Sequence, residues 1–252
     1  MGGKFFTVSV NPDMGADGAT TALSTAFSAG DILFDWHAFD VPKGSSLLVQ
    51  TVVLAAGTNG VDQTIYDVEL FFAKSINGVA PITLGVNNAA VTGEGWYNNI
   101  IGRTYLDVSA NYVGNDGNLV YMNVIQNQQH ARNVVLEGEP DSGSNAGYSK
   151  MYVASIAKGA WDFNTGVLIN MTDSDDLAAL GTATLTVDGN DCRNSFAIGD
   201  VLTAQDGANV GTIESMTDAN TIVLTSVHTD ALTNNDELFH QSPMKFIFSF
   251  EQ

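Results

Sequence analysis

The chain has 252 residues, of which 28 are acidic and 9 are basic, so its formal net charge is -19, and 44% of its residues are hydrophobic. This length fits one large domain or two smaller ones, and the apolar fraction is enough for a buried core. Nucleic-acid binding requires clustered Lys and Arg, and anionic membranes repel an acidic surface, so we expect neither partner. The acidity either keeps the protein soluble in a salty medium or matches a basic partner surface.

The composition favours β structure, since Gly is frequent at 25, Pro is sparse at 5, and Val, Ile, Thr and aromatic residues are plentiful. Cys192 is the only cysteine, which excludes an internal disulfide. No signal-like apolar stretch follows the N-terminus, and no apolar run approaches transmembrane length. We therefore expect a chain that is made in a cytoplasm and used without conventional secretion.

The first two thirds of the chain reads as a series of strands separated by Gly-, Asn- and Asp-rich breaks. Residues 47–56 are almost continuously apolar, which predicts a central strand buried on both faces. Residues 77–99 are Gly- and Asn-rich and predict a long, partly ordered connection, and 137–147 predict a mobile loop. The expected strands are, in chain order, 5–10, 31–40, 47–56, 66–73, 103–109, 118–125, 134–136, 148–157 and 161–170.

The last third is predicted to contain short strands separated by turns, followed by a strand with a different residue pattern. Met244, Phe246, Phe248 and Phe250 alternate with smaller or polar residues, so one face of this last strand is large and apolar and must lie against a core built earlier in the chain. We predict an all-β protein with a jelly-roll-like β-sandwich formed by residues 1–178 plus 241–252, and a small β-barrel inserted at 180–240. The strands expected in the insert are 182–187, 200–204, 210–216, 221–225 and 237–239.

No motif predicts catalysis. The four histidines share no short metal-ligand spacing with one another or with cysteine, and no phosphate-binding loop, dinucleotide fingerprint or nucleophile elbow is present. Some of the 28 acidic residues will approach each other in the fold, but nothing in the sequence selects a pair. We therefore predict no catalytic residues, no metal and no cofactor, and a protein that is not an enzyme. The histidines are His37, His130, His228 and His240.

Two adjacent aromatic residues are the candidate interface residues. Trp96 and Tyr97 lie in the Gly/Asn-rich connection, whereas Trp36 and Trp161 lie on strand patterns typical of core residues. Buried aromatic side chains dominate interface energy, so we expect Trp96 and Tyr97 to contact a partner or another subunit. Stacking on a sugar ring is the alternative role.

Four stretches of the insert together resemble a small β module that is common in structural proteins of tailed phages, notably marine ones. The Asn-, Gly- and Thr-rich, Lys-poor texture of residues 1–170 is also similar to that of phage virion proteins. The resemblance implies a virion component without catalytic residues. The four stretches are Phe196–Leu202, Val210–Ile213, Thr221–Thr225 and Asn235–Leu238.

From this resemblance we expect a capsid decoration (cement) protein of a bacteriophage, located on the capsid exterior and made in the host cytoplasm. Its expected partners are the major capsid protein and further copies of itself, as a trimer or dimer. A tail or baseplate structural protein is the first alternative. A carbohydrate-binding adhesin that uses Trp96 and Tyr97 is the second.

Overall fold

The structure is a computed structural model, and almost all of its regular structure is antiparallel β, in three sheets. The all-β prediction is confirmed. The one α-helix among the residues described is α1 (Cys192–Ser195), and no helix in that part of the chain is long and apolar enough to cross a membrane. The structure describes residues 4–15, 22–42, 44–61, 63–108, 112–116, 119–125, 134–138, 150–170, 182–228 and 232–252.

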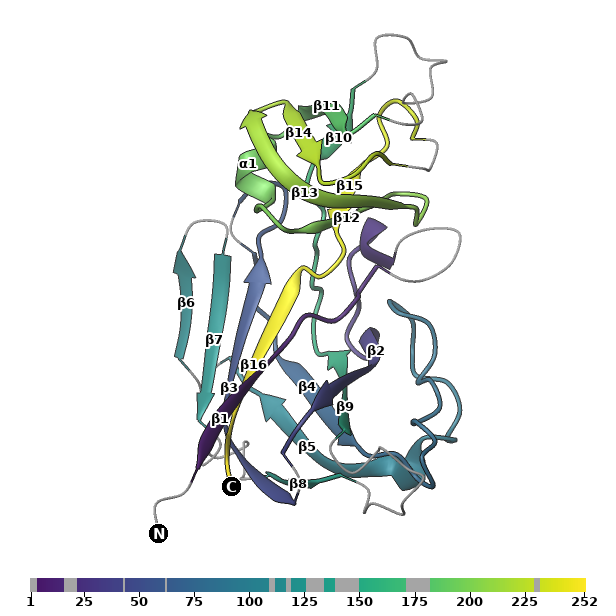
Figure 1. The fold of residues 1–252 in the computed structure, drawn as a ribbon, viewed down its shortest axis with the longest axis vertical. Coiled ribbons are helices and arrows are strands. Elements are labelled where there is room, and N and C mark those ends of the chain that lie inside the picture. The colour runs from purple at the N-terminus through teal and green to yellow at the C-terminus, as the bar shows by residue number, and fades with distance from the viewer. Residues whose placement is uncertain are drawn as a thin grey trace.

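Two of the sheets face each other and form a sandwich (Figure 1). The β9 sheet has four strands, in the order β2 (Ile32–Asp40), β9 (Lys150–Ala157), β4 (Val68–Ala73) and β5 (Ile100–Leu106). The β16 sheet has six, in the order β1 (Phe5–Val10), β16 (Met244–Glu251), β3 (Ser45–Ala56), β7 (Leu119–Ile125) and β6 (Tyr112–Asp116), with β8 (Val134–Glu137) also paired to β3.

The last strand supplies the centre of the core between these sheets. In β16 the side chains of Phe246, Phe248 and Phe250 are fully buried. The Phe248 ring lies 5.5 Å from that of Phe72 on β4, and the Phe246 ring lies 5.3 Å from that of Phe34 on β2. Ring contacts at these distances add to the free energy gained by burying the rings. The strand before the C-terminus therefore completes a core built much earlier in the chain, as the sequence pattern predicts.

The long strand β3 differs from its prediction. We expected its apolar run to be buried on both faces, but its residues alternate between buried and half-buried. One face, which includes Leu48, Val53 and Ala55, packs into the sandwich core. Continuous apolar runs are typical of strands covered on both sides, and here the second face of β3 is only partly covered.

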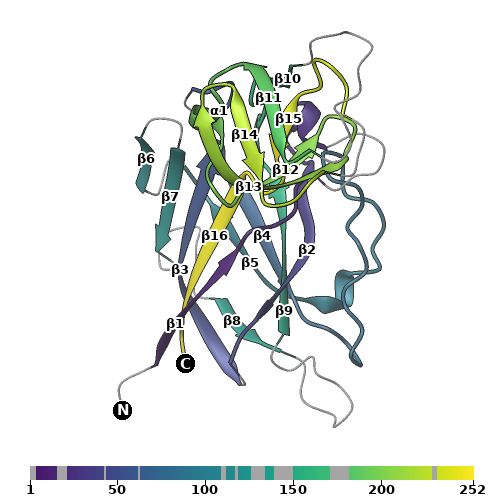
Figure 2. The same ribbon diagram turned by 45° about the horizontal axis from the view of Figure 1, so that its top comes forward.

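The third sheet, called the small sheet here, sits at one end of the long axis of the molecule (Figures 1 and 2). It encloses a separate apolar cluster that includes Leu185, Leu202 and Ile222. Its edge strands adjoin at a bridge between Leu168 and Glu237. The closed barrel expected from the sequence stays a prediction. The strand order is β10 (Val167–Ile169), β11 (Thr184–Gly189), β14 (Thr221–Leu224), β13 (Asn209–Asp218), β12 (Val201–Ala204) and β15 (Leu238–His240).

The small sheet includes one strand that the sequence analysis assigns to the sandwich. β10 falls within the expected strand 161–170, yet it pairs with β11, and Val167 and Ile169 belong to the apolar cluster of the small sheet. A three-residue apolar strand does not carry a pattern that tells which sheet it will join. The division near residues 178–180 lies outside the described residues, so that boundary stays a prediction.

Residues 74–99, called the surface loop here, are more ordered than the sequence predicts. The loop is closed at its base, where Lys74 N donates to Asn99 O (2.9 Å) and Asn99 Nδ2 donates to Lys74 O (2.8 Å). It lies beside β2 and β9 in Figure 1, and its Leu84 joins Ile32, Ala154 and Ile156 in a small core of its own. Because these contacts come from distant strands, the loop's composition alone did not predict them.

Candidate functional site

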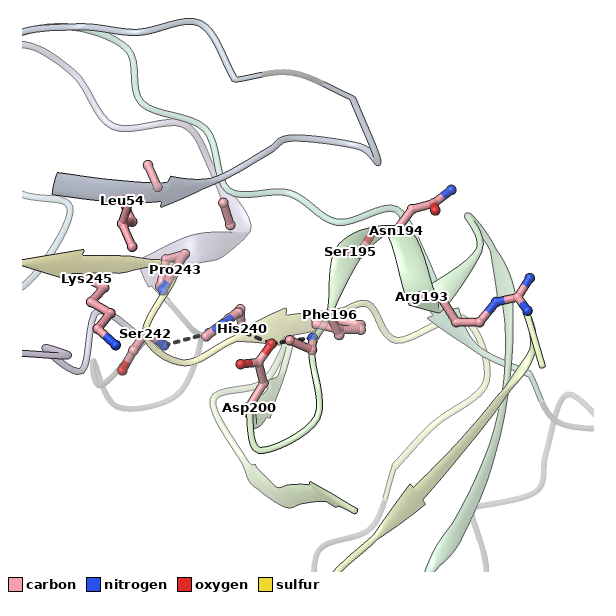
Figure 3. A pocket seen from close by; sticks show the side chains of 13 residues that line it. Leu54, Arg193, Asn194, Ser195, Phe196, Asp200, His240, Ser242, Pro243 and Lys245 are labelled. Carbon is pink, nitrogen blue, oxygen red and sulfur yellow. Dashed lines mark hydrogen bonds and ion pairs between the residues drawn. The ribbon is translucent and has the colours of Figure 1, made fainter. Parts of the chain in front are cut away.

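A cleft of about 440 Å³ lies where the small sheet joins the sandwich (Figure 3). Its walls come from α1 and the turn after it, from the end of β3, and from the chain that leaves β15 to enter β16. The polar centre of the cleft is formed by Asp200, His240 and Ser242, with Lys245 at its edge. The other residues that line the cleft are Leu54, Ala55, Ala56, Arg193, Asn194, Ser195, Phe196, Ala197 and Pro243.

Hydrogen bonds occupy both ring nitrogens of His240. Ser242 N donates to His240 Nδ1 (3.1 Å), so the neutral ring carries its proton on Nε2 and donates it to Asp200 Oδ2 (3.0 Å). The same carboxylate oxygen accepts from Ala197 N (2.7 Å). A general base must have a free nitrogen within reach of the proton it removes. Neither nitrogen of His240 is free in this arrangement. His240, the Asp200 carboxylate and the backbone N–H of Ser242 therefore fix the path of the chain rather than activating a nucleophile.

A second hollow of about 590 Å³ shares Asp200, His240, Ser242 and Lys245 with the first and opens toward the N-terminal segment. There Asp13 Oδ2 accepts from Gln241 Nε2 (2.6 Å), and Met14 N donates to Gln241 O (2.9 Å). These bonds tie the segment after β1 to the chain between β15 and β16.

His37 also lines the second hollow, from strand β2. Burial lowers the pKa of His37, and the negative charge of Asp13 opposes that shift. A lowered pKa favours the neutral imidazole, so at neutral pH the ring adds no positive charge to this hollow.

The chain crosses between the sandwich and the small sheet at two points, one between β15 and β16 and the other just before β10. The crossing before β10 is held by one carboxylate. Glu237 Oε1 accepts from Thr165 N (2.9 Å) and Gly166 N (2.7 Å), and Thr165 Oγ1 donates to Leu238 O (2.5 Å). Burial raises the pKa of Glu237, although its hydrogen bonds act in the opposite direction. Each of the two crossings between the sandwich and the small sheet is therefore fixed by side-chain hydrogen bonds.

The single cysteine is a core residue. Cys192 is fully buried at the start of α1, and its Sγ donates to Asp218 O (3.4 Å). Burial raises the pKa of the thiol, which disfavours the reactive thiolate. Within the described part of the chain, no group of three or more His, Cys, Asp or Glu residues is placed to hold a metal ion. His130 lies outside it.

The structure places the two predicted interface residues in different environments on the surface loop. Trp96 is half-buried and packs against the small core around Leu84, and its indole Nε1 is buried without a hydrogen-bond partner among the described residues. Tyr97, at the start of the 3-10 helix η2 (Tyr97–Asn99), is 72% exposed. Trp96 therefore stabilises the loop by packing against this small core, whereas the exposed ring of Tyr97 can contact a partner. The predicted loop 137–147 lies almost wholly outside the described residues.

The surface loop also concentrates exposed apolar side chains, which sequence reasoning missed. Among the residues described, eleven large apolar side chains are exposed, and six of them lie on this loop. The loop carries a single charged residue beyond Lys74, which is Glu94, although 15% of the whole chain is charged. Exposed apolar side chains with few charges are typical of the centre of a protein interface. The six are Ile76, Val79, Ile82, Val86, Val91 and Tyr97.

No family model matches the chain, and no curated protein matches it. Among solved structures, it aligns with the VP2 subviral particle of infectious bursal disease virus at 8% identity and a TM-score of 0.23. It also aligns with the structure of the Gt strain of that virus at 12% identity and a TM-score of 0.16. Each alignment covers 99% of this chain but only 40% and 42% of the viral chains. TM-scores this low do not establish a shared fold.

Proposed function

We propose that this protein is a non-enzymatic virion structural protein, and specifically a capsid decoration protein that binds the outside of a phage head. The observation that carries the proposal is the surface loop, where six exposed apolar side chains lie on a segment with almost no charge. Such a surface is costly to leave in water and is typical of proteins that work by assembling with others. The resemblance of the insert to phage virion modules agrees with this role.

The proposed mechanism is passive. A protein that binds the assembled shell and not its free subunits stabilises the assembled state by mass action, through binding energy spread over many contacts. The fold suits this task because both chain crossings to the small sheet are held by hydrogen bonds, at Glu237 and at His240. A rigid body loses little conformational entropy when it docks.

The charge of the chain supports binding to protein rather than to nucleic acid. Of its 9 basic residues, Arg103 and Lys158 both pair with the buried carboxylate of Glu69, at 2.6 Å and 2.5 Å. Arg193 pairs with Asp191 at 2.7 Å. These pairs leave few cations for a phosphate-binding stripe.

The experiment is to compare particles that contain the protein with particles assembled without it. We expect particles without it to assemble but to burst at a lower temperature and under milder osmotic shock, and we expect hundreds of copies in each complete particle. Equal stability of the two kinds of particle would refute the decoration role. Tens of copies would instead indicate a tail or baseplate component. Binding of the isolated protein to a cell-surface glycan, lost in Tyr97→Ala, would indicate an adhesin.

A further inference from the structure

We infer that the exposed face of the surface loop is a contact between copies of this chain. The inference does not rest on the virion role, because it follows from where the charges and apolar side chains lie. It assigns the occupant of the loop surface to a second copy, so that on a particle the loop would join neighbouring copies and another surface would face the shell. Three observations lead to it.

The first observation is that the loop folds back on itself, which brings Ile82 next to the turn before Tyr97. Thr92 N donates to Leu84 O (2.8 Å), which pairs the two passes. Gly95 lies against the side chain of Ile82, since a Cβ atom built on this glycine would come within 3.0 Å of Ile82 Cδ1. Ile82, which is 60% exposed, therefore lies next to the turn that presents Tyr97.

The second observation is that this surface is held in place rather than formed on binding. Trp36 Nε1 donates to Ile82 O (3.0 Å), and Asp35 Oδ1 accepts from Leu84 N (2.9 Å). Asn88 Nδ2 donates to Ala22 O (2.8 Å) and to Thr25 O (2.9 Å). These four contacts fix the loop to β2 and to the segment before it, so little ordering is needed when a partner binds.

The third observation identifies the partner by its charge. A basic partner would be met by an acidic surface, because complementary charges meet across an interface. The loop instead carries only Glu94 between residues 75 and 99, in a chain of net charge -19. A second copy carries the same excess of negative charge, so repulsion between two copies is weakest where acidic residues are scarce. The nearly uncharged loop meets that requirement.

The exposed part of the loop supplies much of such a contact. A stable interface commonly engages about 20–30 residues on each side. Of the 26 residues from Lys74 to Asn99, 16 are exposed, so residues beside the loop would complete the contact. When one loop faces the same loop of a second copy, the contact is two-fold symmetric, and each apolar side chain is used twice.

The test compares two matched substitutions by sedimentation velocity over a range of concentrations. Ile82→Asp puts a negative charge on the loop, and Ile198→Asp puts the same charge on the small sheet's side of the molecule, where Ile198 is 71% exposed. We expect the wild-type chain and Ile198→Asp to sediment as the same oligomer. We expect Ile82→Asp to weaken association at least tenfold, because like charges then face each other across the contact. Thermal unfolding shows whether each variant is folded.

Two further measurements keep the inference open to refutation if Ile82→Asp fails to fold. Tyr97→Ser removes a ring that is 72% exposed, and it should also weaken association. Added salt should strengthen wild-type association, because it screens the repulsion between two acidic copies. A wild-type chain that stays monomeric at every concentration would overturn the inference, as would equal association of all the variants. A monomer whose Ile82→Asp variant no longer binds particles would assign the loop to a different protein instead.

Discussion

Glu237 provides a sharp test of how the small sheet is joined to the sandwich. Its carboxylate accepts hydrogen bonds from Thr165 N and Gly166 N. Gly166 N has a second acceptor in Asn164 Oδ1 (3.0 Å), so Glu237→Ala leaves chiefly the buried Thr165 N–H unsatisfied. An unsatisfied buried donor costs about 1–3 kcal/mol. For a chain of this length each kcal/mol lowers the melting temperature by about 2–4 °C.

Glu237→Gln should behave differently, because it keeps an acceptor oxygen and removes the charge. Burial raises the pKa of Glu237, which means that the folded protein disfavours the ionised carboxylate. We therefore expect Glu237→Gln at neutral pH to be as stable as the wild-type chain or more stable. Glu214, which is exposed on β13, supplies the matched control, and Glu214→Ala should change the free energy of unfolding by less than about 0.5 kcal/mol.

The pH dependence has a definite sign. Because the folded-state pKa of Glu237 lies above that of an unfolded chain, about 4.3, the folded state binds the proton more tightly. The contribution of Glu237 to the free energy of unfolding therefore rises as the pH falls from neutral through the folded-state pKa. Urea unfolding at stepwise lower pH should show the wild-type chain gaining stability relative to Glu237→Gln. If Glu237→Ala and Glu237→Gln were equally stable at neutral pH, the proposed role of the acceptor oxygen would be wrong.

Three further outcomes are expected. Phe248→Ala should lower the free energy of unfolding by about 3–5 kcal/mol in urea titrations, because it empties a fully buried site, whereas Phe5→Ala at a 70% exposed position should have little effect. Replacing residues 167–237 by a short Gly/Ser linker should leave a folded sandwich, since Thr165 and Leu238 are already in contact. Near-ultraviolet circular dichroism tests this, and loss of the signal would show that the sandwich depends on the small sheet. The hydrogen bond to Asp67 raises the pKa of Tyr105 to about 12, so Asp67→Asn should bring that pKa back toward 10 in a spectrophotometric titration, with Tyr105→Phe identifying the signal.

Much of the fold could be predicted because strands are local and carry a clear period. The alternating phenylalanines of β16 and the five short strands of the insert are close to where the sequence pattern puts them. Strand partners could not be predicted in the same way. β3 pairs with β16, almost 200 residues later in the chain, and nothing in either segment specifies the other as its neighbour. The assignment of β10 failed for the same reason.

The candidate site was only partly predictable. Composition pointed to Trp96 and Tyr97, but the sequence does not distinguish two adjacent aromatic residues in a Gly-rich segment. The structure does, because Trp96 packs against the small core of the loop and Tyr97 is exposed. The scarcity of charge in residues 75–99 was present in the sequence as a signal. Its meaning depends on knowing that Ile82, Val86 and Val91 face solvent, which the sequence does not show.

The polar groups at the two crossings fix the path of the chain between the sandwich and the small sheet. His240 uses both of its ring nitrogens, Asp200 accepts from both His240 and Ala197, and Glu237 is bound to the backbone before β10. Groups bound in this way resist relative movement of the two parts they join. A rigid junction keeps the small sheet at a constant position relative to the surface loop. If copies meet through that loop, the small sheets of neighbouring copies are then held at a fixed spacing, which is what a protein that repeats on an ordered surface requires.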